Sequence, residues 1–311
     1  MYLLYFVAGF ILLSYGADYL VRGSSSMAVS FGVKKIVVGL TLVAFGTSMP
    51  EFVVSFFAAL NRIDNISVGN IVGSNLANLL LILGLSALIR PFAIRKRLLV
   101  LEIPVLLLIT LLFILFAHDG SLRAVEGLVM LVLFGIYLIY VIINRRIHNL
   151  TEVELIEFDV THRLKNLLFS ILGVIGLIIG GQLTVKGAVG LARALGISDL
   201  IIGLTIVAVG TSLPELFTSV VAVIKKEDEI SIGNIIGSNL FNTAFVLGLI
   251  PIFYPLRIDA QVIHFDNFFM LSVTCLLALI VFISKKLTRF NGIMLISLYC
   301  FYILNLIFHF I

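Results

Sequence analysis

Long apolar runs dominate this chain, and short charged or turn-rich segments separate them. A helix that crosses the hydrocarbon core of a bilayer needs about 20 predominantly apolar residues, and the runs reach that length. We therefore predict an all-α polytopic membrane protein with ten transmembrane helices. They are expected near residues 2–29, 35–60, 66–89, 98–117, 122–143, 165–195, 199–224, 229–254, 264–284 and 290–310.

Composition supports this assignment. Hydrophobic residues make up 61% of the 311 residues, charged residues make up 12%, and the mean hydropathy is +1.20. A soluble domain carries about twice this charged fraction, because its surface must be polar. The formal charge of +4 is small and lies in the loops, so we expect the lipid bilayer, and not nucleic acid, as the partner.

The basic residues are divided unequally between the two sides of the membrane. If loops alternate, one side holds Lys34, Lys35, Arg90, Arg95, Lys96, Arg97, Arg145, Arg146, Arg163, Lys165, Lys225, Lys226, Lys285, Lys286 and Arg289. The other side holds Arg62, Arg123, Arg193 and Arg257. Cytoplasmic loops carry the excess of lysine and arginine. We therefore predict a plasma-membrane protein with both termini outside.

An internal repeat divides the sequence. Ile36–Ser55 reappears as Leu200–Ser219, and Ile66–Asn78 reappears as Ile230–Asn242, with a constant offset of 242 − 78 = 164 residues. Each half holds five predicted helices, an odd number, so the second half enters the membrane from the opposite side. Inverted repeats of this kind are typical of transporters. We assign the first repeat to residues 1–143, a cytoplasmic linker to 144–164 and the second repeat to 165–311.

Each repeat carries a proline in the middle of a span. In the segment Gly46–Glu51, Pro50 removes a hydrogen-bond donor and clashes with the preceding turn. We expect the helix to split there, with Pro50 at the first position of the second half and Thr47 or Ser48 as its cap. Carbonyl groups of residues 44–47 would then be free to face a cation. The segment Gly210–Glu215 predicts the same break in the second repeat.

Two glutamates accompany these breaks. Glu51 and Glu215 lie about midway along their predicted spans, where an unpaired charge costs about 3 kcal/mol or more. No lysine or arginine in either repeat segment lies at the same depth. A bound cation or protons explain the pair better than a purely structural role for protonated carboxyl groups.

Further oxygen atoms follow at helical spacing. Ser74 and Asn78 are four residues apart and share one helix face, as do Ser238 and Asn242. An all-oxygen set suits the hard cations Ca2+ and Na+, although hydrogen bonds between helices are an alternative role for these pairs. The motif glycines Gly69, Gly73, Gly233 and Gly237 are expected to allow close helix packing. Asp18 and Arg22 are expected to form a local ion pair.

The paired GTSxPE and GNxxGSN motifs resemble the two alpha repeats of the sodium/calcium exchanger family, of the prokaryotic type, within the cation/calcium antiporter superfamily. The resemblance implies antiport of Ca2+ against Na+, with a Ca2+ site made by Glu51, Glu215 and the carbonyls of Thr47 and Thr211. It implies flanking Na+ sites drawn from Ala44, Thr47, Ser48 and Ser74 at one end, and from Ala208, Thr211, Ser212 and Ser238 at the other. Asn78 and Asn242 match the remaining central position of each repeat. We expect no cofactor and a functional monomer.

One departure from the family pattern concerns charge. Several members of the family carry aspartate at one of these asparagine positions, whereas this chain has Asn78 and Asn242. The site therefore holds at most two negative charges, which one Ca2+ neutralises and three Na+ would exceed. The number of sodium ions, and any use of protons or potassium, stays open.

Three other functions fit the sequence less well. A proton/calcium exchanger of the same fold would let the glutamates titrate instead of binding Na+. A channel would need pore-lining rings from identical subunits, whereas this chain carries its symmetry internally. An enzyme is not supported, because the sequence has no His-Glu-x-x-His motif, no serine–histidine pair at midplane depth and no cofactor fingerprint. The expected mechanism is alternating access, with the first and sixth spans moving against the helices that hold the ligands.

Overall fold

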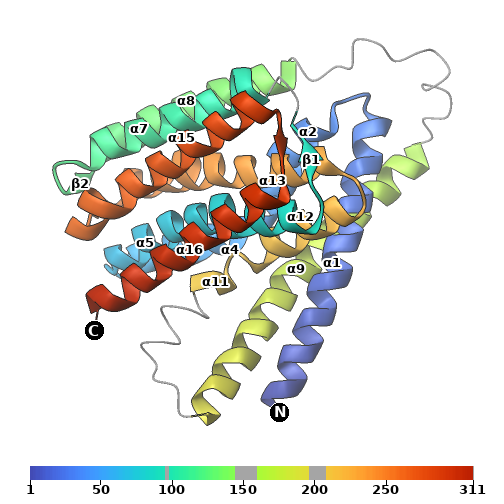
Figure 1. Cartoon of the computed structure of the whole chain (residues 1–311), viewed down its shortest axis with the longest axis horizontal. Helices are drawn as coiled ribbons and strands as arrows, with labels where there is room; N and C mark the ends of the chain where they lie inside the picture. The colour runs from blue at the N-terminus through green and yellow to red at the C-terminus, as the bar shows by residue number, and fades with distance from the viewer. Residues whose placement is uncertain (95–97, 144–159, 196–207, 311) are drawn as a thin grey trace. The chain divides into compact units, whose positions relative to one another are not determined.

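The computed structural model describes residues 1–94, 98–143, 160–195 and 208–310, and within them the protein is almost entirely helical (Figure 1). The first repeat contains α1 (Tyr2–Ser30), α2 (Lys35–Val38), α3 (Ala44–Thr47), α4 (Met49–Leu60), α5 (Asp64–Leu76), α6 (Leu83–Ile89), α7 (Ile103–Ala117) and α8 (Ala124–Ile143). Three π-helical segments interrupt them: η1 (Gly39–Val43), η2 (Ala77–Ile82) and η3 (Leu98–Glu102). Two short strands, β1 (Phe92–Ala93) and β2 (Ser121–Leu122), lie in the connections.

The second repeat follows the same order. Its helices are α9 (Val160–Ala194), α11 (Ala208–Gly210), α12 (Leu213–Ile224), α13 (Asp228–Leu240), α14 (Leu247–Phe253), α15 (Asn267–Ser284) and α16 (Arg289–Phe310). The π-helical segments are η6 (Phe241–Val246) and η7 (Val262–Asp266), and the strands are β3 (Leu256–Arg257) and β4 (Lys286–Leu287). The run α5–η2–α6 and the run α13–η6–α14 have identical boundaries once the 164-residue offset is applied. The sequence repeat is therefore also a repeat of local structure.

Eight described helices are long and apolar enough to cross a membrane, and the bent pair of Lys35–Thr47 and Met49–Leu60 makes a ninth. A tenth span was predicted at 199–224, but residues 199–207 lie outside the described part, which contains α11 and α12 from that span. The number ten therefore stays a prediction. The predicted linker, 144–164, also lies mostly outside the described residues, and its residues 160–164 already belong to α9.

Chain contacts divide the protein into two compact units, and each unit draws on both repeats. Unit 1 contains Met1–Thr47, Tyr140–Ile235 and Cys300–Ile311, and unit 2 contains Ser48–Ile139 and Ile236–Tyr299. The boundaries of the compact units therefore do not coincide with the boundaries of the sequence repeats.

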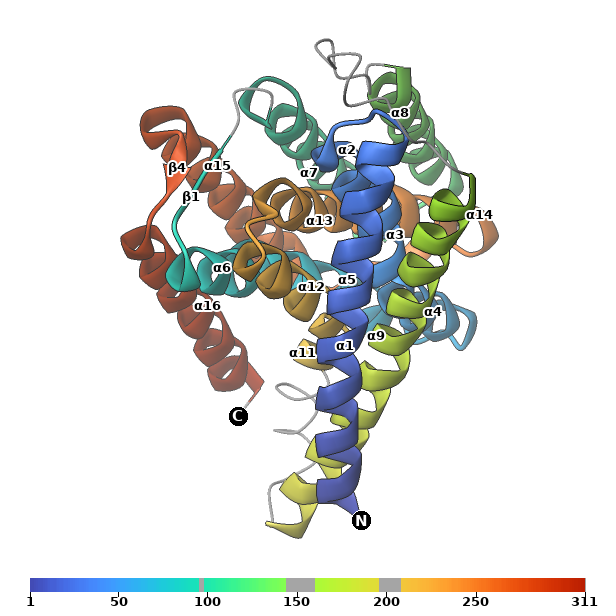
Figure 2. The same ribbon diagram turned by 90° about the vertical axis from the view of Figure 1, so that its right-hand side faces the viewer.

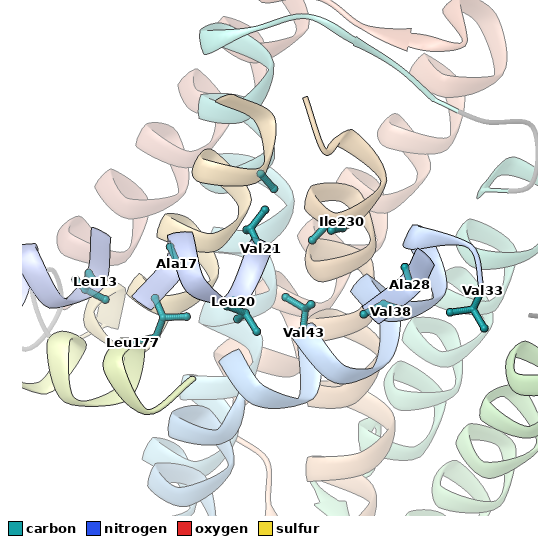
Figure 3. Packing of buried hydrophobic residues seen from close by; sticks show 11 residues of the cluster. Leu13, Ala17, Leu20, Val21, Ala28, Val33, Val38, Val43, Leu177 and Ile230 are labelled. Carbon is teal, nitrogen blue, oxygen red and sulfur yellow. The ribbon is translucent and has the colours of Figure 1, made fainter. Parts of the chain in front are cut away.

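Unit 1 is built on α1 and α9, which lie side by side along most of their length (Figures 1 and 2). Glycines allow this close approach. A Cβ atom on Gly16 would lie 2.8 Å from the backbone nitrogen of Leu177, and one on Gly173 would lie 2.8 Å from the carbonyl oxygen of Gly16. Leu13, Ala17 and Leu20 of α1 pack in the same hydrophobic cluster as Leu177 of α9 (Figure 3). Interlocking glycines are a common means of helix packing in membranes.

The predicted ion pair in unit 1 is confirmed. Arg22 Nε lies 2.8 Å from Asp18 Oδ2, one turn along α1. Lys225, which follows α12, also pairs with Asp18. Nearby, Lys35 Nζ donates to both carboxylate oxygens of Glu227, over 2.9 and 2.8 Å. These pairs attach α1 and the start of the second span to the turn between α12 and α13.

Unit 2 packs α5 against α4 and packs α15 against α5 and α7. Two antiparallel ladders join the repeats within it, because β1 pairs with β4 and β2 pairs with β3. Phe241 and Phe245 stack with ring centroids 4.7 Å apart, and Phe134 packs against both. Large apolar side chains also point outward, with Phe282 72% exposed and Val125 74% exposed. An outward apolar surface is expected where lipid is the solvent.

Candidate functional site

Both predicted helix breaks are present. α3 ends at Thr47 and α4 begins at Met49, with a bend of 46° between the two parts of the span. Ser48 in the break has φ −85° and ψ 7°, and Ser212, before α12, has φ −86° and ψ 7°. The shared GTSxPE motif therefore produces the same turn in both repeats.

The details of the break differ from the prediction by one residue. Pro50 and Pro214 occupy the second position of their helices, after Met49 and Leu213. This is compatible with helix geometry, because the first four backbone N–H groups of a helix have no partner within it. Ser48 stands at the predicted cap position, but its side chain makes no capping hydrogen bond.

In unit 2, Glu51 is completely buried. Its Oε1 accepts a hydrogen bond from Ser74 Oγ over 3.5 Å, the outer limit for such a bond. Asn70 Nδ2 donates to the carbonyl oxygen of Glu51 over 3.3 Å and to Ser55 Oγ over 2.9 Å. α5 thus supplies both the hydroxyl beside the carboxylate and the amide that holds its backbone.

In unit 1, the second repeat makes the corresponding arrangement. Glu215 is completely buried, and Asn234 Nδ2 donates to its carbonyl oxygen over 3.4 Å and to Ser219 Oγ over 3.0 Å. Thr47 Oγ1 adds hydrogen bonds to Asn234 Oδ1 over 3.0 Å and to the carbonyl oxygen of Ala44 over 3.3 Å. Asn234 therefore ties the end of α3 to the start of α12.

Sequence reasoning missed the roles of Asn70 and Asn234. Both asparagines belong to the quoted GNxxGSN motifs, but neither was assigned a function. The available signal was the pairing of each with a serine 15 residues earlier (70 − 55 and 234 − 219). Two polar residues repeated at one spacing in apolar spans indicate a hydrogen bond between neighbouring helices.

Most of the remaining predicted side chains are buried as well. Asn78 and Asn242 occupy the second position of η2 and η6, and both are completely buried, as is Ser238. π-helical turns widen a helix locally and occur often at functional sites. Ser212 is 3% exposed, Thr211 is half-buried, and Ala208 begins α11.

The packing expected of the motif glycines is only partly present. No described atom lies within 4 Å of a Cβ built on Gly69 or Gly73, so the prediction is wrong for this pair. A Cβ on Gly233 would lie 2.8 Å from the carbonyl oxygen of Ile36 and 3.0 Å from the Cα of Gly39. Close approach is therefore a property of the second repeat's Gly233, and Gly69 and Gly73 face open space.

The predicted site residues share one kind of donor atom, which is oxygen. They offer carboxylate, amide, hydroxyl and carbonyl oxygens, the donor set of hard cations. In the part of the chain that the structure describes, no three His, Cys, Asp or Glu side chains gather as they would around a transition metal.

Comparison with known proteins identifies the family. The family model described as sodium/calcium exchanger protein matches residues 1–143 and 165–308. The chain belongs to this family. Membership makes it a multi-pass membrane transporter and not an enzyme.

Similar proteins match the exchanger over nearly its whole length. A putative antiporter, CaxA of Alkalimonas amylolytica, is 39% identical, with 93% of this chain and 92% of the relative covered. The sodium/calcium exchanger MaX1 of Methanosarcina acetivorans is 31% identical, with 94% of both chains covered. A solved structure of the sodium–calcium exchanger NCX_Mj has a TM-score of 0.87 at 36% identity, with 97% of this chain and 99% of that chain covered.

The Asn234 contacts lead to a prediction for the exchanger. Asn234→Ala removes the hydrogen bonds to Glu215, Ser219 and Thr47, so the backbone that carries Glu215 loses its attachment to α13. We expect ion exchange to fall by about tenfold or more. The rate is measured on purified protein in liposomes, normalised to the folded protein incorporated.

Asn61→Ala is the matched control. Asn61 Nδ2 donates to the carbonyl oxygen of Phe57 over 2.8 Å, but the side chain is exposed at the end of α4. This variant should exchange ions at the wild-type rate. Equal rates for Asn234→Ala and Asn61→Ala would contradict the assignment.

Proposed function

We propose that the chain is a secondary active antiporter that exchanges Ca2+ for Na+ at a site containing Glu51 and Glu215. The observation that carries the proposal is the sign of the buried charge. The buried charged side chains of the described residues are all acidic, namely Glu51, Asp64, Glu102, Glu215 and Asp266, and no described lysine or arginine is buried. A surplus of buried carboxylates over buried basic side chains among the described residues favours cations as ligands.

Competition for these carboxylates would couple the two fluxes. Ca2+ and Na+ both prefer oxygen ligands, and Glu51 and Glu215 supply the negative charge for either. A site loaded with Ca2+ then cannot hold its full complement of Na+. Each ion can cross only when the other has left, which is the requirement for exchange.

Alternating access is the proposed mechanism. Two inverted repeats would allow the same ligands to be approached from either side of the membrane. The long helices α1 and α9, whose glycines and hydrophobic cluster pack them together, would move as a pair while the ligand side chains stay in place. The proposed orientation keeps both termini outside the cell.

The test is uptake of calcium-45 by liposomes that contain the purified protein. We expect uptake that requires internal sodium and disappears when the sodium gradient is absent. Calcium uptake that does not depend on sodium and is driven by a proton gradient would overturn the proposal. It would favour the second candidate, a proton/calcium exchanger, for which the low charge of a site with Asn78 and Asn242 is the supporting observation.

The charge count predicts the electrical behaviour of exchange. Two carboxylates balance one Ca2+ or two Na+, so we expect two sodium ions for each calcium ion and no net charge transfer. A potential of 100 mV would then change the uptake rate little, whereas each net charge moved would be worth about 2.3 kcal/mol. Potassium-diffusion potentials set with valinomycin provide the measurement. Strong stimulation of wild-type uptake by an inside-positive or inside-negative potential would contradict the count.

A further inference from the structure

Four asparagines in unit 2 form two amide pairs. Asn78 Nδ2 donates to Asn239 Oδ1 over 3.2 Å, and Asn242 Nδ2 donates to Asn75 Oδ1 over 3.3 Å. All four side chains are buried, with exposed fractions of 0–2%. The offset of 164 residues converts Asn75 into Asn239 and Asn78 into Asn242. Each pair therefore joins one repeat to the other, and the two pairs are related by the repeat.

The pairing leaves two oxygen atoms unused. Asn78 Oδ1 and Asn242 Oδ1 accept no hydrogen bond from the described residues. In each of these amides the nitrogen is committed to its partner, so the oxygen must point away from that partner. A buried acceptor without a donor is unfavourable. A cation can satisfy such an acceptor, because the oxygen of an amide binds cations and its NH2 group does not.

We propose that Asn75 and Asn239 are positioning residues for cation binding. Each holds the NH2 group of its partner, Asn242 or Asn78, so that the partner's oxygen faces the transported ion. Neither needs to touch the ion itself. This inference rests on the proposed function, because it takes Asn78 and Asn242 to be ligands.

The two pairs are not equally anchored. Asn75 Nδ2 donates to Thr243 Oγ1 over 2.7 Å and lies 3.8 Å from the sulfur of Met270. The position that corresponds to Thr243 in the first repeat is Leu79, which offers no acceptor, and Asn239 Nδ2 donates to no described atom. The hydrogen bond to Thr243 holds the Asn75 side chain in place, whereas the Asn239 side chain has no such anchor among the described residues. Asn75 should therefore contribute more to ion affinity.

The experiment measures equilibrium binding of calcium-45 to the purified, folded protein and, separately, sodium-driven uptake. Asn75→Ala should raise the dissociation constant for Ca2+ by about tenfold or more, the usual effect of losing a residue that orients a metal ligand. Asn239→Ala should raise it by a smaller factor. Thr243→Val removes the anchoring hydroxyl and should also raise it, whereas Thr243→Ser keeps the hydroxyl and should restore the wild-type value.

Ser86→Ala is the control, because Ser86 is equally buried in unit 2 and its hydroxyl makes no hydrogen bond with the described residues. A packing role alone would lower the yield or thermal stability of Asn75→Ala and leave its Ca2+ affinity unchanged, and that result would overturn the inference. Equal Ca2+ affinities for Thr243→Val and Thr243→Ser would show that the Thr243 hydroxyl does not anchor Asn75. If the wild-type protein binds Ca2+ but shows no sodium-driven uptake, the proposed function is refuted. The binding measurements on the Asn75 and Asn239 variants would still test the positioning role.

Discussion

Glu51→Gln and Glu215→Gln are expected to abolish sodium-driven calcium uptake, with a loss of about 100-fold or more for each. Glutamine keeps the size of the side chain and removes its charge. Each carboxylate is completely buried beside a helix break, and in the proposed site the two together would supply the charge that balances the ion. A site with one negative charge leaves one charge of Ca2+ without compensation in a medium of low dielectric constant.

The measurement is calcium-45 uptake into liposomes at matched amounts of folded protein. Glu126→Gln is the control, since Glu126 accepts a hydrogen bond from the backbone of Arg123 at the exposed start of α8, over 2.7 Å. We expect this variant to retain wild-type uptake. Full activity in the double variant Glu51→Gln, Glu215→Gln would show that the ions bind elsewhere.

Gly173→Ala is expected to destabilise the protein strongly. The added Cβ would lie 2.5 Å from the backbone nitrogen of Leu20 and 2.8 Å from the carbonyl oxygen of Gly16. Backbone atoms cannot move aside as a flexible side chain can, so α1 and α9 must separate. Overpacking of this kind costs about 1–3 kcal/mol, enough to lower the melting temperature by on the order of 5 °C.

Thermal unfolding of the detergent-solubilised protein gives the measurement, and Gly135→Ala gives the control. Gly135 lies in the interior of α8, where no described atom comes within 4 Å of a built Cβ. Alanine also favours the helix more than glycine does, so this variant should unfold at the wild-type temperature or slightly above it. An unchanged melting temperature for Gly173→Ala would mean that α1 and α9 do not need close contact.

The internal repeat made much of this fold predictable from sequence. Hydropathy located the long helices, and the two mid-span prolines located the breaks before Met49 and Leu213 to within one residue. Glu51 and Glu215, which the sequence places about midway along apolar spans, are both completely buried. These features are local, because the segment itself determines them through helix geometry and the cost of a charge in lipid.

Features that depend on neighbouring helices were less accessible. The hydrogen bonds of Asn70 and Asn234 join helices from separate segments, and sequence spacing within one helix does not reveal such partners. The open space beside Gly69 and Gly73 was missed for the same reason, since a glycine motif permits close packing without requiring it. The π-helical turns that carry Asn78 and Asn242 have no simple sequence signal.

Displacement of bound Ca2+ by Na+ tests the central claim most directly. Purified wild-type protein in detergent is equilibrated with calcium-45 near its dissociation constant, and sodium is then titrated against choline at constant ionic strength. If both ions use Glu51 and Glu215, sodium will displace calcium completely, with a steep dependence that reflects two sodium ions for each calcium ion. Calcium binding that stays unchanged as sodium replaces choline would contradict a shared site, and with it the proposed exchange mechanism.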